Sequence, residues 1–263
     1  MKHNEMIEHI ENIAPVVNAA PWDNSGLQVA SIRSDVAHVA LMLDPTPASI
    51  TKALKIGADM IISHHPLAIT PRLPSRLDDF HTVLRLLFTH DVLLYSPHTS
   101  LDASLRGPVA WLADVFGLVN RQALEHIADH PEGKPHYGFG IVGDLPSPIS
   151  YNEFTDKLAA SMGKYAWRAS GPKPGTVTRM AYCPGSGESM IHAAASAGAD
   201  VYITGDIKYH AALGTPIRAL DVGHFILEEL MMRSLADRLR ERCGSITVSF
   251  IEAADPFTFE GAV

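Results

Sequence analysis

Histidine side chains recur in this sequence at positions that suit a metal site. His64 and His65 follow the apolar segment Met60-Ile61-Ile62 and precede Pro66. In an open α/β sheet, ligands gather at the carboxyl ends of buried strands, and this pair is expected at such an end. Adjacent residues of a strand point to opposite faces, so the two imidazoles could serve different metal ions. A pair of hydrogen-bonded loop histidines is the alternative.

A second kind of pair places a carboxylate four residues after a histidine. If a helix begins near His224, this spacing brings the side chains of His224 and Glu228 to one face, with β-carbons about 5–6 Å apart. Both side chains could then reach one metal ion. A solvent-exposed helix pair is the alternative, but the intervening Ile226 and Leu227 favour a buried position.

His98 and Asp102 have the same spacing after another predicted strand, and we expect them in a loop at its end. Five ligand-type residues result: His64, His65, Asp102, His224 and Glu228. A catalytic zinc site typically uses three protein ligands, so five that include a bridging carboxylate suit a binuclear centre. Histidine with carboxylate suits zinc, iron, manganese or nickel, so we expect two divalent ions of undetermined identity per chain.

Two further segments carry polar groups whose role stays open. Residues 183–188, Cys-Pro-Gly-Ser-Gly-Glu, are expected to lead from a strand into a helix, where backbone N–H groups can hold phosphate, although most such turns are only turns. Asp206, Lys208 and His210 could bind substrate or transfer protons; a capped helix start is the alternative. Because histidine titrates near neutral pH, His98 and His210 are the candidate catalytic proton carriers.

The segments that position these residues alternate between two patterns. Continuous apolar runs predict strands covered on both faces at residues 39–43, 60–62 and 92–95. Apolar residues at helical spacing predict helices over residues 77–90, 105–116 and 225–242. Strands that alternate with helices of this length indicate an α/β fold.

The chain also repeats part of its own pattern. Residues 50–59 align with residues 191–200, because each block is a predicted helix that ends in Gly-Ala-Asp before an apolar strand. Downstream, His98 to Asp102 aligns with His224 to Glu228 in the same order. Chance is the alternative, but two matched blocks favour an internal duplication. We therefore expect two α/β halves, residues 1–125 and 126–263.

Composition excludes several classes of protein. Lys and Arg number 21 against 29 Asp and Glu, and the net charge of −8 without a basic run argues against non-specific nucleic-acid binding. With 46% hydrophobic and 19% charged residues, the chain is not intrinsically disordered. No apolar run reaches the roughly 20 residues of a membrane span, and the N-terminus lacks a signal peptide's apolar block. Two cysteines cannot form a disulfide framework, so we expect a cytoplasmic protein.

Five ordered motifs resemble those of one known family. They are WDNSGLQ (22–28), IISHHPL (61–67), HTSLD (98–102), TGDIKYH (204–210) and GHFILE (223–228). The chain is thus similar to the GTP cyclohydrolase 1 type 2 homologues, also called Nif-three-like dinuclear metal-centre proteins. The resemblance implies two intertwined α/β lobes with mixed sheets and a toroidal homohexamer. It also implies metal ligands at His64, His65, Asp102, His224 and Glu228, with Glu228 bridging.

Two functions are compatible with such a site. A metal-dependent hydrolase would attack a nucleotide-like or other small phosphorylated or heterocyclic substrate through a metal-bridging hydroxide. A non-enzymatic metal-binding, delivery or regulatory protein would need the same ligands but no general acid or base. Fold and site do not fix a substrate, and we favour the hydrolase.

Overall fold

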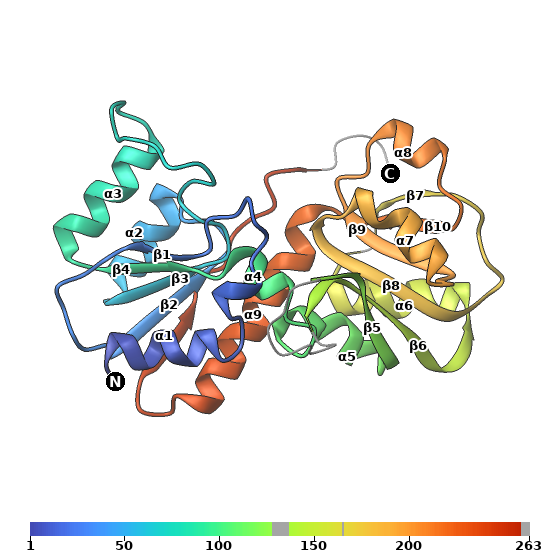
Figure 1. Ribbon diagram of the computed structural model, residues 1–263, viewed down its shortest axis with the longest axis horizontal. Coiled ribbons are helices and arrows are strands. Elements are labelled where there is room, and N and C mark those ends of the chain that lie inside the picture. The colour runs from blue at the N-terminus through green and yellow to red at the C-terminus, as the bar shows by residue number, and fades with distance from the viewer. Residues whose placement is uncertain (128–136, 165, 259–263) are drawn as a thin grey trace.

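Two lobes, each built on one β-sheet, make up the computed structural model, which describes residues 1–127, 137–164 and 166–258 (Figure 1). The first sheet has the strand order β1-β4-β3-β2-β11 and the second the order β5-β6-β8-β9-β10-β7. Both sheets mix parallel and antiparallel pairs, so the predicted α/β fold with mixed sheets is confirmed.

The first sheet contains β1 (Gly26–Val29), β2 (His38–Met42), β3 (Met60–Ser63), β4 (Leu93–Ser96) and β11 (Thr247–Phe250). Every residue of β3 and β4 is buried, as the continuous apolar runs predicted. Successive side chains of a strand point to opposite faces. On one face, Ile61 packs with α2 (Pro47–Lys55) and α3 (Asp79–His90). On the other face, Ile62 packs with α1 (His3–Glu11).

The second sheet contains β5 (Val119–His126), β6 (Gly138–Ser150), β7 (Arg168–Ser170), β8 (Thr176–Ser186), β9 (Val201–Gly205) and β10 (Arg218–Asp221). One face carries α7 (Ile191–Ser196) and α8 (Tyr209–Leu213). The other face packs on α5 (Trp111–Phe116) and α6 (Tyr151–Met162). Helix α6 begins with a capping box, in which Ser150 and Glu153 each accept a hydrogen bond from the other's backbone N–H.

The long helix α9 (His224–Arg242) lies between the lobes and contributes to the core of both (Figure 1). Its buried side chains include Leu227, Met231, Met232, Leu235 and Leu239. After α9 the chain returns to the first lobe, where β11 pairs in parallel with β2. The predicted helix over 225–242 is therefore confirmed, and it begins one residue earlier. Within the described part of the chain, no helix has the length and apolar character needed to cross a bilayer.

The internal duplication is visible in the topology. The order β1-β4-β3-β2 of the first sheet corresponds to β7-β10-β9-β8 of the second, each with one antiparallel edge strand and three parallel strands. The aligned glycines Gly57 and Gly198 have similar positive φ values of 78° and 76°. The aspartates that follow also match, because Asp59 accepts the backbone N–H of His38 in β2 and Asp200 accepts that of Arg179 in β8.

One predicted helix is wrong in its first half. Residues 105–107 are not helical, and a 3-10 turn (Pro108–Ala110) precedes α5, which starts only at Trp111. Proline has no N–H to donate and fixes its own φ, so Pro108 starts a helical segment and cannot continue one. Two other 3-10 turns cover Val16–Asn18 and Glu188–Met190.

Candidate metal centre

The predicted ligand residues come from three elements that end or begin at one place between the lobes. His64 and His65 directly follow β3, and His224 is the first residue of α9. His98 and Asp102 bound α4 (His98–Asp102), so the prediction that they lie in a loop is wrong. The backbone closes this short helix through bonds such as Leu101 N–H to Pro97 O at 3.0 Å.

Glu228 is the residue on which the histidines converge. Its Oε1 lies 3.6 Å from Nε2 of His64, and its Oε2 lies 3.2 Å from Nε2 of His65 and 2.9 Å from Nε2 of His224. Asp102 approaches the same group, with Oδ1 3.8 Å from Nε2 of His64. The structure thus brings all five predicted ligand residues together.

His98, predicted as a proton carrier, belongs to the same cluster. Potential ligand atoms of His64, His65 and His98 lie within 4.8 Å of one another, and those of His65, His224 and Glu228 form a second such group. His65 is common to both groups. Two overlapping sets of three donors suit two neighbouring cations, and they make His98 a sixth side chain that could bind one of them.

Three aspartates each accept a hydrogen bond from Nδ1 of one histidine of the cluster. Nδ1 of His65 donates to Asp44 at 2.7 Å, and Nδ1 of His224 donates to Asp206 at 2.8 Å. His98 is held in the same way by another aspartate, described below. Such pairs fix the imidazole tautomer and direct Nε2 toward the centre, as carboxylate–histidine pairs do in metal sites. Sequence reasoning considered Asp206 only for substrate binding or proton transfer, and it missed Asp44, whose signal was its place directly after a buried strand.

Asp23 is the third of these carboxylates and was also missed. It accepts from Nδ1 of His98 at 2.7 Å, from the backbone N–H of Asn24 at 2.7 Å and from the hydroxyls of Ser25 and Thr99. Its side chain is fully buried; burial raises its pKa, but the hydrogen bonds, first that from His98, bring the pKa well below the usual range. The sequence signal for Asp23 was its position in the turn-rich segment WDNSG (22–26). That segment contains no histidine that would have marked it as part of a metal site.

Charges in this cluster are strongly perturbed. Burial lowers the pKa of His64 to about 4. Burial also disfavours charge on His65, but hydrogen bonds to Asp44 and Glu228 raise its pKa to about 10, and Glu228 raises that of His224 to about 9. Each cause acts through burial, charge or hydrogen bonding, which are the usual sources of pKa shifts.

The two carboxylates of the cluster shift in opposite directions. Burial and the charge of Glu228 raise the pKa of Asp102 well above its ordinary value. Burial opposes ionisation of Glu228 as well, yet His64 and the other imidazoles hold its pKa well below that value. At neutral pH Glu228 is therefore ionised and lies beside the protonated imidazoles of His65 and His224.

Several polar atoms of the cluster are buried and have no hydrogen-bond partner among the described residues. They include Nδ1 and Nε2 of His64 and Oδ1 of Asp102. Buried polar groups are almost always satisfied, so convergent unsatisfied nitrogen and oxygen atoms point to a missing partner. A divalent cation accepts this donor set of imidazoles and carboxylates, and the residues present therefore fit the predicted metals.

Of the two interpretations of the glycine-rich segment, a phosphate site or only a turn, the structure favours the turn. Strand β8 extends to Ser186, and a 3-10 turn (Glu188–Met190) and then α7 follow, so the segment leads from a strand into a helix as predicted. The N–H of Gly187 donates to Thr204 Oγ1 at 2.9 Å, which leaves it no bond for a phosphate. Gly185, at φ +63°, lies against the metal cluster instead, since a β-carbon built there would lie 2.2 Å from Oε1 of Glu228.

Two other candidates are not brought into the cluster. Lys208 forms an ion pair with Glu188 at 3.2 Å on an exposed part of the surface. His210 is exposed on α8, where its ring contacts Tyr209 at 5.3 Å between centroids. In the described structure, His210 shares no group of potential metal ligands with the other histidines.

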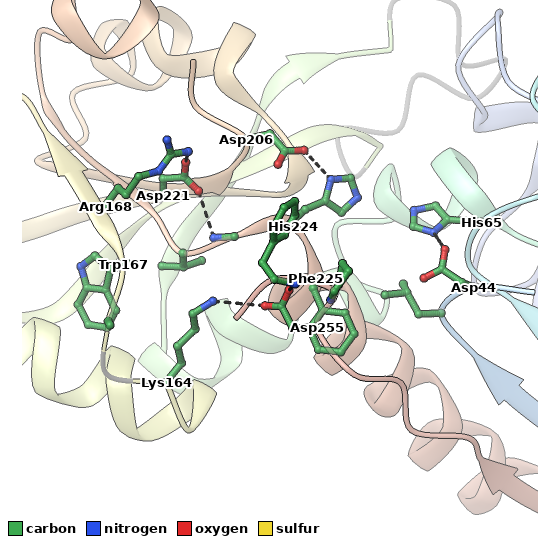
Figure 2. A pocket seen from close by; sticks show the side chains of 16 residues that line it. Asp44, His65, Lys164, Trp167, Arg168, Asp206, Asp221, His224, Phe225 and Asp255 are labelled. Carbon is green, nitrogen blue, oxygen red and sulfur yellow. Dashed lines mark hydrogen bonds and ion pairs between the residues drawn. The ribbon is translucent and has the colours of Figure 1, made fainter. Parts of the chain in front are cut away.

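A cavity of about 640 Å³ opens beside the centre. His65 and Asp44 line one side, while Asp206 and the start of α9 line the next (Figure 2). The remaining walls come from the segment before β7, the end of β10 and the segment after β11. The candidate centre is thus accessible to a small molecule.

Comparisons with known proteins identify the family of this chain. The family model Duf34/NIF3 (NGG1p interacting factor 3) matches residues 1–256. A GTP cyclohydrolase 1 type 2 homolog from Clostridium perfringens is 32% identical over 98% of this chain and 100% of its own length. One from Methanocaldococcus jannaschii is also 32% identical, over 81% of this chain and 83% of its own.

Solved structures agree in fold over nearly the whole chain. Staphylococcus aureus protein SA1388 superposes with a TM-score of 0.86 at 25% identity and covers 99% of both chains. Reduced HcgD from Methanocaldococcus jannaschii gives a TM-score of 0.82 at 26% identity, covering 96% of this chain and 98% of its own.

Proposed function

Because the chain belongs to the Duf34/NIF3 family, we propose that it is a dinuclear metal-dependent hydrolase of a small nucleotide-like, phosphorylated or heterocyclic substrate. One observation carries this proposal: four histidines, Asp102 and Glu228 form one cluster in which several potential ligand atoms are buried and have no partner in the described structure. Bound divalent ions would supply a water activated at neutral pH and would polarise a substrate oxygen.

The protein's own residues have separable roles in this proposal. His64, His65, Asp102, His224 and Glu228 would hold the ions; one carboxylate oxygen of Glu228 faces His64 and the other faces His65 and His224. Asp44 and Asp206 would keep His65 and His224 in the tautomer that leaves Nε2 free.

His98 is the better placed of the two predicted proton carriers. Asp23 holds its Nδ1, and the imidazole lies beside His64 and His65. It could therefore accept a proton near the bound ions or act as a further ligand. His210 lies on α8 outside the cluster, so we give it no role in the reaction.

A metal-binding or delivery protein is the second candidate, and the exposure of the outer histidines favours it. The side chain of His224 is 36% exposed and that of His65 is 25% exposed, so an ion at these residues is open to exchange. Exchange of bound metal within minutes would support delivery, whereas slow exchange with turnover would support catalysis.

Metal content per chain, measured by mass spectrometry on protein purified without nickel affinity, tests the proposal. We expect about two ions per chain in the parent protein and a clear loss in Glu228→Gln. The neighbouring buried Glu229 accepts the N–H of Ala253 at 3.0 Å, so Glu229→Gln is a matched control that should keep the metal. Absence of metal after reconstitution would refute the proposal, and unchanged turnover in Glu228→Ala would exclude this site.

A homohexamer with the sites facing its interior is also proposed, on the basis of family membership. Light scattering after size exclusion would test it, because the expected particle has six times the 28.5 kDa of one chain.

A further inference from the structure

Three aromatic side chains line the cavity beside the metal cluster. Trp167 and Phe225 are partly buried, while Phe257, on the segment after β11, is 80% exposed. Each comes from a different part of the chain, so the tertiary fold alone assembles them. Flat apolar side chains that border a cavity of this size suit a planar ring, which stacks on aromatic faces at little entropic cost.

Two cationic side chains share the wall with these rings. Nζ of Lys164 lies 3.6 Å from Asp255, and both side chains are largely buried. The guanidinium of Arg168 pairs with Asp221 yet remains 72% exposed. Charged donors of this kind form the strongest hydrogen bonds with phosphate or carboxylate groups.

A glycine makes room for one of these cations. A β-carbon at Gly223 would lie 3.3 Å from Nζ of Lys164, and the φ of +90° at Gly223 is itself unfavourable for other residues. Gly223 directly precedes His224. The Lys164 ammonium therefore lies beside the start of α9, which carries His224 and Glu228.

The carboxylates that line the cavity already have partners. Asp44 and Asp206 accept from histidines, and Asp255 faces Lys164. Asp221 also accepts the backbone N–H groups of Ile207 and Gly223 at 3.1 Å. An anionic group that enters would therefore meet carboxylates whose charge is compensated and a guanidinium that is largely open to solvent.

The cavity has two chemically different ends. Figure 2 shows His65 on one side, Trp167 and Arg168 on the opposite side, and Phe225 between them. We propose that this cavity binds a planar heteroaromatic ring that carries an anionic substituent, with the ring on Trp167 and Phe225 and the anion on Lys164 and Arg168. This inference deepens the proposed function and rests on it only for the metal at the His65 end.

Calorimetric titration with three matched probes tests the assignment. Guanosine 5′-monophosphate carries ring and anion, guanosine carries the ring alone, and inorganic phosphate carries the anion alone. We expect the monophosphate to bind about tenfold or more tightly than either other probe, on both metal-loaded and metal-free protein. A monophosphate that binds no more tightly than inorganic phosphate would overturn the proposal.

Single substitutions separate the two halves of the site. Trp167→Leu should weaken the monophosphate and guanosine alike by about tenfold, whereas Lys164→Met should weaken the monophosphate and leave guanosine unchanged. Phe88→Leu and Lys55→Met, at exposed positions of α3 and α2, are the matched controls. Monophosphate affinity that is unchanged in both Trp167→Leu and Lys164→Met would refute the proposed site.

The outcomes also distinguish this site from the metal centre. Binding that requires metal and ignores both substitutions would place the phosphate on the ions; it would refute this inference and leave the proposed function standing. If the protein never holds metal but still binds the monophosphate, that result would support the cavity assignment and refute the proposed function.

Discussion

Gly185 and Glu228 lie so close that a β-carbon on Gly185 would be 2.2 Å from Oε1 of the carboxylate. Gly185 is the next-to-last residue of β8, and Glu228 is the fifth residue of α9. Only a residue without a side chain permits this approach. The contact explains why a glycine is needed at position 185.

Replacing Gly185 with alanine should therefore damage the metal centre. The added methyl group would displace the Glu228 carboxylate, and the positive φ would strain the backbone by about 1 kcal/mol or more. We expect metal affinity to fall by at least about tenfold, measured with a competing chelator. Gly175→Ala is the control, because nothing lies within 4 Å of its β-carbon position. Equal affinity in both variants would show that Glu228 does not hold metal in this geometry.

Asp44, whose carboxylate accepts a hydrogen bond from His65, should affect metal affinity without being a metal ligand itself. Asp44→Asn keeps the shape but weakens the hold on Nδ1 of His65, which lies 2.7 Å away. We expect metal affinity to decrease about 10–100-fold while the folded structure persists. Asp35→Asn, at an exposed ion pair with Lys2, should leave affinity unchanged. A loss no greater than that of Asp35→Asn would contradict a positioning role for Asp44.

Metal affinity should increase with pH. In the metal-free protein the raised pKa values, about 10 for His65 and about 9 for His224, keep both imidazoles protonated at neutral pH. A metal ligand must be a neutral imidazole, so binding releases these protons, and affinity falls as pH falls below both values. Calorimetry in buffers of different ionisation enthalpy should report release of about two or more protons per chain near neutral pH. Binding without proton release would contradict this assignment.

The packing beneath the second sheet should dominate the stability of that lobe. Phe154 of α6 is fully buried and stacks on Phe116 of α5, with ring centroids 4.9 Å apart. Phe154→Ala should lower the free energy of unfolding by about 3–5 kcal/mol, as measured by urea denaturation. Phe88→Ala, at a side chain that is 65% exposed, should change it by less than about 0.5 kcal/mol. Similar urea midpoints for Phe154→Ala and Phe88→Ala would contradict a stabilising role for Phe154 in this core.

Much of the fold follows from local patterns in the sequence. The continuous apolar runs located β2, β3 and β4, and the spacing after His224 located α9. The repeated Gly-Ala-Asp blocks revealed the duplication, which the matching strand orders confirm. Where local rules compete, prediction failed: Pro108 interrupted an otherwise helical pattern, and residues 98–102 form a helix too short to show a period.

The sequence by itself also identified candidate metal ligands, because histidines and carboxylates recur after predicted strands and at the start of a predicted helix. Only the tertiary structure decided how they are held. Asp23 and His98 are 75 positions apart, yet they share a hydrogen bond. The cavity's aromatic side chains likewise come from segments far apart in the chain. Helix and strand periods describe neighbours along the chain, whereas these contacts depend on how two sheets and α9 pack together.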